Sequence, residues 1–452
     1  MPGAAFHGMK SIRQSEDMKS KTFALISLGC AKNLVNSEQM IYLMSEAGFE
    51  LISDVSSADL VIINTCAFID DAKQEAIDTI LETAAVCPNI IVTGCLPERY
   101  KEEIASEFPE VKAFLGIGSF ADVVPAAEAV LSGSSLLSFK DNSAPVEEIP
   151  RVISTGPSWA FLRIAEGCDN FCAFCAIPYI RGSYRSRSFE NVLEEARSLA
   201  EHGVREIIII AQDITRYGID LYGRPRLAEL CHEISKIDGV DWIRLHYLYP
   251  EVINDELIDE IASNDKIVKY LDIPIQHIND KILYDMNRHT TSQEVRSLFS
   301  TLRERIPGLV LRTSLITGLP GEGEAEFDEL CCFLKEAKIE RAGVFPYSPE
   351  EGTPAAEMPH VDYETAKHRA DFIMSEIQLP IMDAFCASFI GKQLKVLCTG
   401  EENGYMIGRS YADSPDIDGL VAFEGDCVEG DFAQVLIYDA EDGVLYGKEI
   451  EK

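Results

Sequence analysis

Three cysteines lie close together in the middle of the chain, directly after an apolar run that is typical of a β-strand. Three residues separate Cys168 from Cys172, and two separate Cys172 from Cys175. With this spacing, one loop can wrap three thiolates around a metal cluster. A structural zinc site usually has four protein ligands, and no fourth Cys or His follows here at zinc-finger spacing. A four-iron cluster held by three thiolates keeps one iron free to bind a small molecule.

Three further cysteines each follow a predicted strand in the first part of the chain. The predicted strands are residues 23–28, 60–63 and 90–93, and the cysteines are Cys30, Cys66 and Cys95. The carboxyl ends of parallel strands lie along one edge of a sheet, where such sheets bind ligands, so we expect these thiols to converge. They would form a second three-thiolate site. Gly29 and Gly94 would relieve backbone crowding beside it.

Two other interpretations of the cysteines remain open. Buried free cysteines often serve as small apolar side chains, although such thiols are usually scattered rather than grouped. Alternatively, both triads hold structural zinc in a metal-binding interaction protein that is not an enzyme. Cys87 precedes its strand and is left out of the site, and the other six cysteines are interpreted as packing thiols.

Alternating apolar and amphipathic segments from Thr22 onward predict an α/β chain with parallel sheets covered by helices. In the first part, helices are expected at residues 37–47 and 69–85. After a segment with linker composition, six further strands are predicted at residues 160–165, 206–211, 242–245, 269–275, 310–316 and 341–345. Six βα units suggest an incomplete, partial (βα)6 version of the TIM-like parallel barrel, whose active site lies at the carboxyl ends of its strands.

Polar residues follow several of these six strands. They are Gln212, Asp213, His246, Gln276, His277, Gly318 and Glu322. In a barrel they would ring the cysteine loop, although polar residues at strand ends are also common as turns or caps. Arg181, Arg185 and Arg187 follow the cysteine loop and could bind a carboxylate of a substrate or cofactor. They could equally neutralise nearby acidic surface.

The tail is predicted to be a small antiparallel β-barrel. A long helix is expected from residue 363 to about 390. Five short β-like runs follow it, separated by Gly, Asp and Asn turns. Residues 391–452 contain five basic and fourteen acidic residues, a net charge of -9. Such a surface is poorly suited to hold RNA through its phosphates and would suit a basic protein.

Composition limits the partners and the compartment. The net charge of -35 repels phosphate backbones and attracts basic proteins, although a solubility charge or a saline habitat would also explain it. Thirteen cysteines, an odd number, do not suggest a secreted disulfide framework. No apolar run approaches the ~20 residues of a membrane span, and the first residues lack the apolar core of a signal peptide. A cytoplasmic protein without a membrane partner is expected.

The loop spacing, with Phe174 just before Cys175, resembles the signature of the radical S-adenosylmethionine (SAM) enzymes. In that superfamily the free iron binds the amino and carboxylate groups of SAM. An electron from the cluster then splits the sulfonium to give a 5′-deoxyadenosyl radical. By this resemblance Phe174, Gln212, Asp213, Arg312, Gly318 and Glu322 are expected to bind SAM.

The rest of the chain resembles the methylthiotransferases, a family of radical SAM enzymes with two 4Fe-4S clusters. The similarity lies in residues 27–38, 64–66 and 93–96, and the tail resembles the TRAM domain that ends these enzymes. It implies a leader at 1–21, an amino-terminal domain at 22–141, a linker at 142–157, a radical SAM domain at 158–375 and a TRAM domain at 376–452. Both clusters are expected to face one cavity between the first domain and the barrel.

Residues 27–33, 212–218 and 270–277 resemble the RimO-type branch, which modifies an aspartate of the small-subunit ribosomal protein S-twelve. In that case one SAM methylates a sulfur held at the first triad, and a second SAM, cleaved at the second triad, yields the radical that takes a hydrogen from the aspartate β-carbon. The implied partners are the basic ribosomal protein or its subunit, an electron donor such as flavodoxin or ferredoxin, and a sulfur donor. The alternative is the MiaB-type branch, which modifies an adenosine of transfer RNA, although transfer RNA is an unlikely partner for so acidic a chain.

Overall fold

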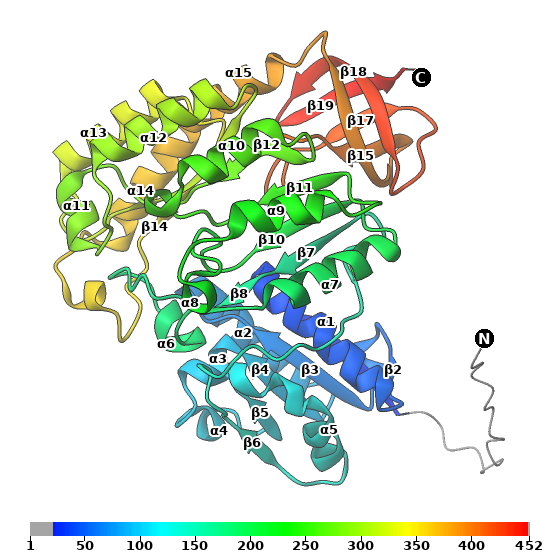
Figure 1. Cartoon of the computed structure of the whole chain (residues 1–452). Helices are drawn as coiled ribbons and strands as arrows, with labels where there is room; N and C mark the ends of the chain where they lie inside the picture. Colours follow the sequence, from blue (N-terminus) through cyan, green and yellow to red (C-terminus); the bar gives the residue numbers. More distant parts are fainter. Residues whose placement is uncertain (1–20, 451–452) are drawn as a thin grey trace.

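The computed structural model describes residues 21–450, so that all of the predicted leader except Lys21 lies outside the described residues. Three β-sheet units follow one another along the chain (Figure 1). The first lies at the bottom of the view, the second above it, and the third at the upper right. Among the described residues, no helix is long and apolar enough to cross a membrane.

The first unit is a six-stranded sheet in the order β2-β1-β3-β4-β5-β6, and every neighbouring pair is parallel. Its strands are β1 (Thr22–Ser27), β2 (Glu50–Leu51), β3 (Leu60–Thr65), β4 (Ile90–Gly94), β5 (Ala113–Leu115) and β6 (Leu136–Ser138). The three predicted strands are present. The sequence analysis did not predict β2, β5 and β6, which have two or three residues each and carry little periodic signal.

Helices cover both faces of this sheet because side chains of a strand alternate between its faces. Leu60 and Ile62 of β3 pack with α1 (Ala31–Glu46) and α5 (Val123–Leu131). Val61 and Ile63 pack on the other face with α2 (Asp70–Ala84), α3 (Cys95–Arg99) and α4 (Ile104–Glu107). The helix predicted at residues 37–47 begins earlier, at Ala31. Its first turns are polar yet buried, so the apolar pattern used for prediction missed them.

The second unit is an open, fully parallel sheet in the order β14-β13-β12-β11-β10-β7. Its strands are β7 (Trp159–Arg163), β10 (Glu206–Ile210), β11 (Trp242–Leu245), β12 (Ile267–Asp272), β13 (Val310–Thr317) and β14 (Arg341–Pro346). They match the six predicted strands. The helices between them are α7 (Phe189–Glu201), α8 (Ile219–Tyr222), α9 (Leu227–Ser235), α10 (Asp255–Ser263), α11 (Asp280–Asp285), α12 (Ser292–Arg305) and α13 (Glu324–Ala337). The cysteine loop lies between the short strands β8 (Ala165–Glu166) and β9 (Arg185–Ser186) and is followed by α6 (Ile177–Arg181).

The third unit is a closed barrel in the order β15-β16-β17-β19-β18. Its strands are β15 (Gln393–Glu402), β16 (Tyr405–Arg409), β17 (Val421–Glu424), β18 (Phe432–Glu441) and β19 (Val444–Glu449). Four of its pairings are antiparallel, and β17 pairs with β19 in parallel. The predicted long helix before it is α14 (Tyr363–Ile373), a π-helical turn at Met374–Gln378 and α15 (Leu379–Ala387).

The closed barrel packs against one face of the open sheet. Ala160 and Leu162 of β7 lie in the core shared with the outer helices, whereas Trp159 and Phe161 lie in a core shared with the closed barrel. Glu206 of β10 joins the two units, because its carboxylate is 2.7 Å from Arg244 Nε and 2.6 Å from Arg409 Nη2. All three side chains are buried.

Candidate functional site

The interdomain triad consists of Cys30, Cys66 and Cys95, each placed just after a different strand of the first sheet. Cys30 precedes α1, Cys66 follows β3, and Cys95 begins α3 after β4. A Cβ atom on Gly29 would lie 2.7 Å from Cys66 Cβ and 3.0 Å from its Sγ. Only glycine therefore allows the segment of Cys30 to pass this close to Cys66, as predicted from Gly29.

Asn33 ties the three segments of this triad together. Its Nδ2 donates to the carbonyl oxygens of Leu28 (3.0 Å) and Thr65 (2.9 Å), which precede Cys30 and Cys66. Its Oδ1 lies 3.9 Å from Cys95 Sγ. Asn33 therefore contacts the segments of all three cysteines, and the convergence of their thiols at one cluster stays a prediction.

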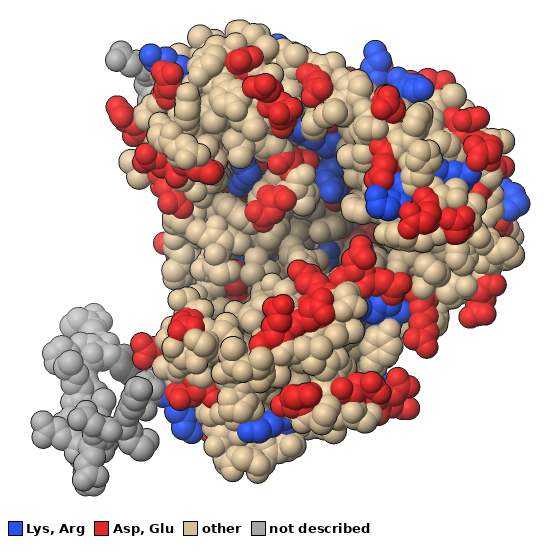
Figure 2. All heavy atoms as spheres, turned by 180° about the vertical axis from the view of Figure 1, so that it is seen from behind, with Lys and Arg blue, Asp and Glu red and all other residues tan. Residues whose placement is uncertain are grey.

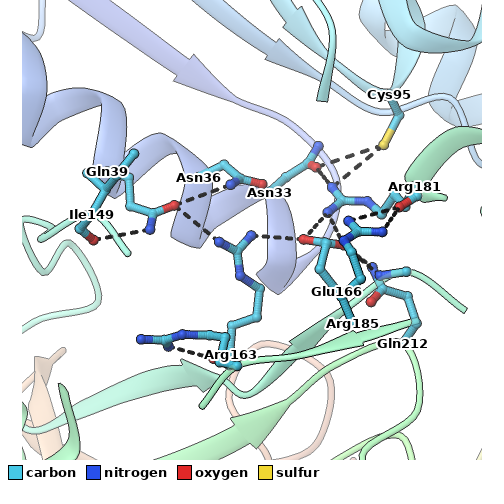
Figure 3. A network of polar contacts seen from close by, with 12 residues as sticks. Asn33, Asn36, Gln39, Cys95, Ile149, Arg163, Glu166, Arg181, Arg185 and Gln212 are labelled. Carbon is cyan, nitrogen blue, oxygen red and sulfur yellow. Dashed lines mark hydrogen bonds and ion pairs between the residues drawn. The ribbon is translucent and has the colours of Figure 1, made fainter. Parts of the chain in front are cut away.

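Arg181 reaches the interdomain triad from the other side of the domain interface (Figure 3). It ends α6, its side chain is 1% exposed, and its Nη2 lies 3.8 Å from Cys95 Sγ and also donates to Asn33 Oδ1. Its Nη1 is 2.9 and 3.0 Å from the two carboxylate oxygens of Glu166. A residue just after the cysteine loop thus contacts a thiol of the first domain.

The loop triad consists of Cys168, Cys172 and Cys175, which lie on one loop of the second unit. The Cys168 amide donates to the Gly182 carbonyl (3.1 Å), and the Cys175 amide donates to the Cys172 carbonyl (2.9 Å). Asn170 Nδ2 donates to Asp213 at 3.0 Å, which fastens the loop to the end of β10. The backbone of this loop is therefore held at several points.

A buried arginine also lies beside the loop triad. Arg288 Nη1 is 3.8 Å from Cys172 Sγ, and its Nη2 donates to the Pro274 carbonyl at 2.7 Å. The guanidinium lies 4.1 Å from the centre of the Tyr249 ring, and the Tyr249 hydroxyl is 3.6 Å from Cys172 Sγ. Arg288 forms no ion pair with any carboxylate of the described residues, so it is a buried cation that an anionic ligand would balance.

Burial favours the neutral form of most of these thiols. It raises the pKa of Cys66 to about 12 and the pKa of Cys168 to about 12, and it also raises the pKa of Cys95 and of Cys175. Burial acts in the same direction on Cys30, but Lys32 and Arg181 outweigh it, so the pKa of this thiol falls below its ordinary value. Because metal binding deprotonates a thiol, a cluster would replace these buried thiols by thiolates.

The donor sets fit an iron-sulfur cluster at each triad. Among the described residues, no three His, Cys, Asp or Glu side chains converge closely enough to hold a single metal ion. Thiols are nevertheless the side chains that hold iron-sulfur clusters, and in each triad one sulfur lies 3.8 Å from a buried guanidinium nitrogen. Negative charge on the thiolates would balance that guanidinium.

The predicted SAM-binding residues occupy two different environments. Near the loop triad, Gln212 Nε2 donates to Glu166 at 2.6 Å, and Asp213 accepts from Asn170 and Thr215. The Gln212 Oε1 atom is buried without a hydrogen-bond partner. Phe174 packs in an apolar cluster with Cys172. These three residues therefore lie in or beside the cysteine loop.

The other three predicted residues lie on or after β13. Glu322 is fully buried, accepts from the Gly318 amide (2.8 Å) and pairs with Arg369 (2.8 Å). A Cβ on Gly318 would collide with Ala366 of α14. These contacts hold the end of β13 against α14. Arg312 Nη1 is 2.7 Å from Asp272, and Arg312 lines a cavity of about 800 Å³ between β13, β14, α14, α15 and the closed barrel.

The remaining polar residues at strand ends contact other parts of the protein. His246 Nε2 lies 3.0 Å from Ser414 Oγ of the closed barrel, and His277 Nε2 lies 3.2 Å from Glu322. Of the three predicted arginines, Arg187 pairs with Glu148 and Glu195. Arg185 donates to backbone carbonyls. Arg181 is almost completely buried and pairs with the buried Glu166, whereas Arg187 is buried but pairs with Glu148, which is exposed.

Sequence reasoning missed several residues of the site. Asn33 lies inside a quoted motif, but an amide that joins three loops gives no periodic signal. Arg288 and Tyr249 belong to segments far from the cysteine loop in the sequence, and Glu166, two residues before Cys168, belongs to no metal-ligand pattern. Lys32 lies before the predicted helix, and it is 7% exposed in the first turn of α1. Asn33 and Lys32 contact residues of the second unit, whereas Arg288 and Tyr249 meet Cys172 through the fold of the second unit alone.

The face opposite the view of Figure 1 is hollowed at its centre (Figure 2). Lys and Arg side chains lie in the hollow, and Asp and Glu side chains are spread over the surface around it. None of the six cysteines of the triads lines the 800 Å³ cavity. The prediction that both triads face one cavity stays a prediction, supported by the contact of Arg181 with Cys95.

Comparison with known proteins gives three matching family models. Residues 22–116 match "Uncharacterized protein family UPF0004", residues 162–334 match the radical SAM superfamily, and residues 390–450 match the TRAM domain. Among solved structures, the radical SAM methyltransferase TsrM from Kitasatospora setae has a TM-score of 0.56 at 15% identity, over 74% of this chain and 77% of that chain. At this identity the likeness shows the fold alone.

Much closer relatives cover nearly the whole chain. A protein of Caldanaerobacter subterraneus subsp. tengcongensis is 47% identical over 95% of this chain and 100% of its own length. A protein of Lachnoclostridium phytofermentans is 48% identical over 93% of this chain and 98% of its own length. Both are named ribosomal protein uS12 methylthiotransferase RimO. The radical SAM model and these relatives therefore define a radical SAM methylthiotransferase, an enzyme that uses SAM and an iron-sulfur cluster. The chain belongs to the RimO family of ribosomal protein uS12 methylthiotransferases.

Proposed function

We propose that this chain transfers a methylthio group to the β-carbon of an aspartate in the small-subunit ribosomal protein uS12, the protein S-twelve of the sequence analysis. The observation that carries this proposal is the 47% identity, over the full length of the relative, to a protein named for that reaction. A C–H bond at this carbon has no proton acidic enough for a general base, so radical chemistry is the reasonable route. Because ribosomes are cytoplasmic, the reaction would take place in the cytoplasm.

We propose two 4Fe-4S clusters, one held by Cys30, Cys66 and Cys95 and one by Cys168, Cys172 and Cys175. When bound, the clusters supply the electron that cleaves SAM at the loop triad and a site for the methylthio sulfur at the interdomain triad. Phe174, Gln212, Asp213, Arg312, Gly318 and Glu322 remain the proposed SAM-binding set. Within that set, Gln212 has the strongest support, because its buried Oε1 lacks a partner.

The residues around the loop triad orient it and keep water away. Asp213 fixes the loop through Asn170, and Arg288 lies beside Cys172. Phe174, Tyr249, Ile282, Met286, Leu319 and Tyr347 form an apolar cluster with Cys172. Excluding water from this site would protect a radical from side reactions.

The charge of the protein supports a basic protein substrate. The chain carries a net charge of -35, and its last sixty-two residues, 391–452, carry -9. Acidic surface attracts basic ribosomal proteins and repels the phosphates of transfer RNA. An electron donor such as flavodoxin or ferredoxin and a separate sulfur donor would complete the reaction.

The test is a direct competition between the two substrates. Anaerobically reconstituted protein is incubated with SAM, sulfide, a reductant and an equimolar mixture of uS12 and transfer RNA. Mass spectrometry should find one methylthio group on a single uS12 aspartate. Methylthio-adenosine in the transfer RNA with unchanged uS12 would overturn the proposal. A variant with the interdomain triad replaced by alanine is the control, and it should cleave SAM without modifying uS12.

A further inference from the structure

Three buried cations at the domain interface, Arg163, Arg181 and Lys32, contact only one buried carboxylate, and the last two lie beside the interdomain triad. Arg163 Nη1 and Arg181 Nη1 are both 2.9 Å from Glu166, so two guanidinium groups share one carboxylate. The relative exposures of Lys32, Arg163, Arg181 and Glu166 are 7%, 3%, 1% and 5%. Buried charges are costly unless they are balanced, so an excess of positive charge at this place requires an explanation.

Lys32 contributes a second unbalanced cation. Its Nζ lies 3.4 Å from the centre of the Tyr247 ring, which belongs to the second unit. No carboxylate of the described residues forms an ion pair with Lys32. A ring face stabilises a cation but leaves its charge in place. Lys32 follows Cys30 by two residues on α1.

The Arg181 side chain is held toward the thiols. Asn33 Nδ2 is bound to two backbone carbonyls, which directs Asn33 Oδ1 toward Arg181 Nη2 (Figure 3). The same Nη2 is 3.8 Å from Cys95 Sγ. On its other side, Glu166 holds Nη1 with both oxygens. The guanidinium therefore has one fixed position between Glu166 and the triad.

We propose that Arg181 and Lys32 are positioning residues that set the charge balance, and with it the reduction potential, of the cluster at the interdomain triad. This inference rests on the proposed function, because it requires a cluster at Cys30, Cys66 and Cys95. One-electron reduction adds one negative charge to a cluster. A fixed positive charge nearby stabilises the reduced form more than the oxidised form, in a buried site where water screens little. Glu166 has the opposite effect.

The test uses a protein that holds only this cluster. Cys168, Cys172 and Cys175 are replaced by alanine, the interdomain cluster is reconstituted, and its reduction by dithionite is followed by electron paramagnetic resonance against a series of redox mediators. Arg181→Gln and Lys32→Met should each lower the ratio of reduced to oxidised cluster at a fixed potential about tenfold, or ~59 mV for a one-electron couple. Glu166→Gln should raise that ratio. Arg181→Lys keeps the charge and should stay near the parent.

Shifts of the reduction potential in opposite directions would distinguish an effect of charge from an effect of altered packing. Loss of packing at Arg181 or at Glu166 would disturb the same network, so it would not move the potential in opposite directions. Arg288→Gln in the same background is the matched control and should leave the potential unchanged, because Arg288 contacts Cys172 of the other triad. If Arg181→Gln fails to fold, Lys32→Met and Glu166→Gln still give the two opposite shifts.

Iron and sulfide analysis distinguishes the two ways to fail. If the parent protein with an intact interdomain triad binds no cluster, the proposed function is wrong. If it binds a cluster but the variants leave the potential unchanged, or all shift it in one direction, the proposed function stands. The inference about Arg181 and Lys32 is then wrong.

Discussion

The two thiol triads share one feature and are otherwise built in opposite ways. Each has one buried arginine 3.8 Å from one sulfur: Arg181 beside Cys95 and Arg288 beside Cys172. The loop triad and its arginine both belong to the second unit. The interdomain triad comes from three strand ends of the first unit, whereas Arg181 comes from α6 of the second. One site is complete within its domain, and the other is complete only when the two domains are docked.

The partners of the two arginines differ as well. Arg181 is paired with the Glu166 carboxylate, whereas Arg288 contacts a backbone carbonyl and the ring of Tyr249. An ion pair therefore fixes the Arg181 side chain, whereas an aromatic ring and one hydrogen bond fix the Arg288 side chain. We therefore expect a weaker contact between the first and second units to leave the loop triad functional and to disturb the interdomain triad.

The largest expected effect comes from removing either triad, because we expect the two triads to serve different steps of the reaction. A variant with Cys168, Cys172 and Cys175 replaced by alanine should lose both SAM cleavage and methylthio transfer. A variant with Cys30, Cys66 and Cys95 replaced should keep SAM cleavage and lose transfer. Each should bind half of the iron of the unmodified protein. Quantification of 5′-deoxyadenosine, product and iron tests this, and loss of all iron in either variant would contradict two independent sites.

Removing the cation at the loop triad should affect that site alone. Arg288→Gln leaves Cys172 without its guanidinium neighbour, and loss of a group that supports a metal ligand typically weakens metal binding or activity about 10–100-fold. We expect slower SAM cleavage by about that factor, with the iron of the interdomain triad retained. Arg296→Gln, in which a half-buried arginine paired with Glu336 is changed, is a control that should cleave SAM normally. Equal losses in the two variants would argue against a local role of Arg288.

Weaker docking should affect the interdomain triad alone. Glu350 follows β14, is buried, and lies 3.0 Å from Lys73 Nζ and 2.6 Å from Arg99 Nη1 of the first unit. Removing one partner of a buried ion pair costs about 3–5 kcal/mol, because the charge of Arg99 is then left without a carboxylate; Lys73 keeps its ion pair with Asp70. Glu350→Gln should lower methylthio transfer about tenfold or more while SAM cleavage continues.

The neighbouring carboxylate provides the control for this docking experiment. The Glu351 side chain is exposed, and the structure shows its backbone carbonyl, rather than its carboxylate, accepting from Arg99. Glu351→Gln should therefore transfer and cleave like the unmodified protein. Parallel loss of cleavage and transfer in Glu350→Gln would show that the loop triad also depends on docking.

Two kinds of feature could be predicted from the sequence: the repeated apolar strands, and the cysteines placed directly after strands. The six strands of the second unit are apolar runs of ordinary length, and each carries its own signal. The loop triad was found by the spacing of its cysteines, and the other triad because position after a strand is itself a prediction of place in a parallel sheet. Cys30, Cys66 and Cys95 do follow three strands of the first sheet, although they are far apart in the chain.

The sequence could not predict the contacts between side chains of different domains. The first turns of α1 are polar, so they lack the apolar periodicity from which the rest of this helix was predicted. Arg181 was noticed among three arginines, but its choice of Glu166 and Cys95 depends on docking. Glu322 and Gly318 were expected at SAM by resemblance, and the structure shows contacts with Arg369 and α14 that residue type alone does not reveal.

The smallest expected effect is a pH dependence at the contact between the open sheet and the closed barrel. His246 lies at the contact between the open sheet and the closed barrel, 3.0 Å from Ser414 Oγ. Burial, followed by the charges of Arg244 and Arg312, holds the pKa of His246 well below its usual value. The other charges acting on it are also positive and come from α1 and β16, namely Lys32 and Arg409. The ring is therefore neutral in the folded protein.

A neutral buried histidine destabilises the fold in acid, because the unfolded chain takes up the proton first. Since the pKa is lower in the folded state, the stabilisation is complete above the unfolded value of about 6.5. Below it, stability falls by about 1.4 kcal/mol per pH unit. Urea unfolding at pH 7.5 and pH 5.5 measures this slope, and His246→Gln, which keeps a polar group toward Ser414, should flatten it. If the two proteins lose stability equally in acid, carboxylates such as Glu206 dominate instead, and docking of the closed barrel depends on charge as the interdomain triad does.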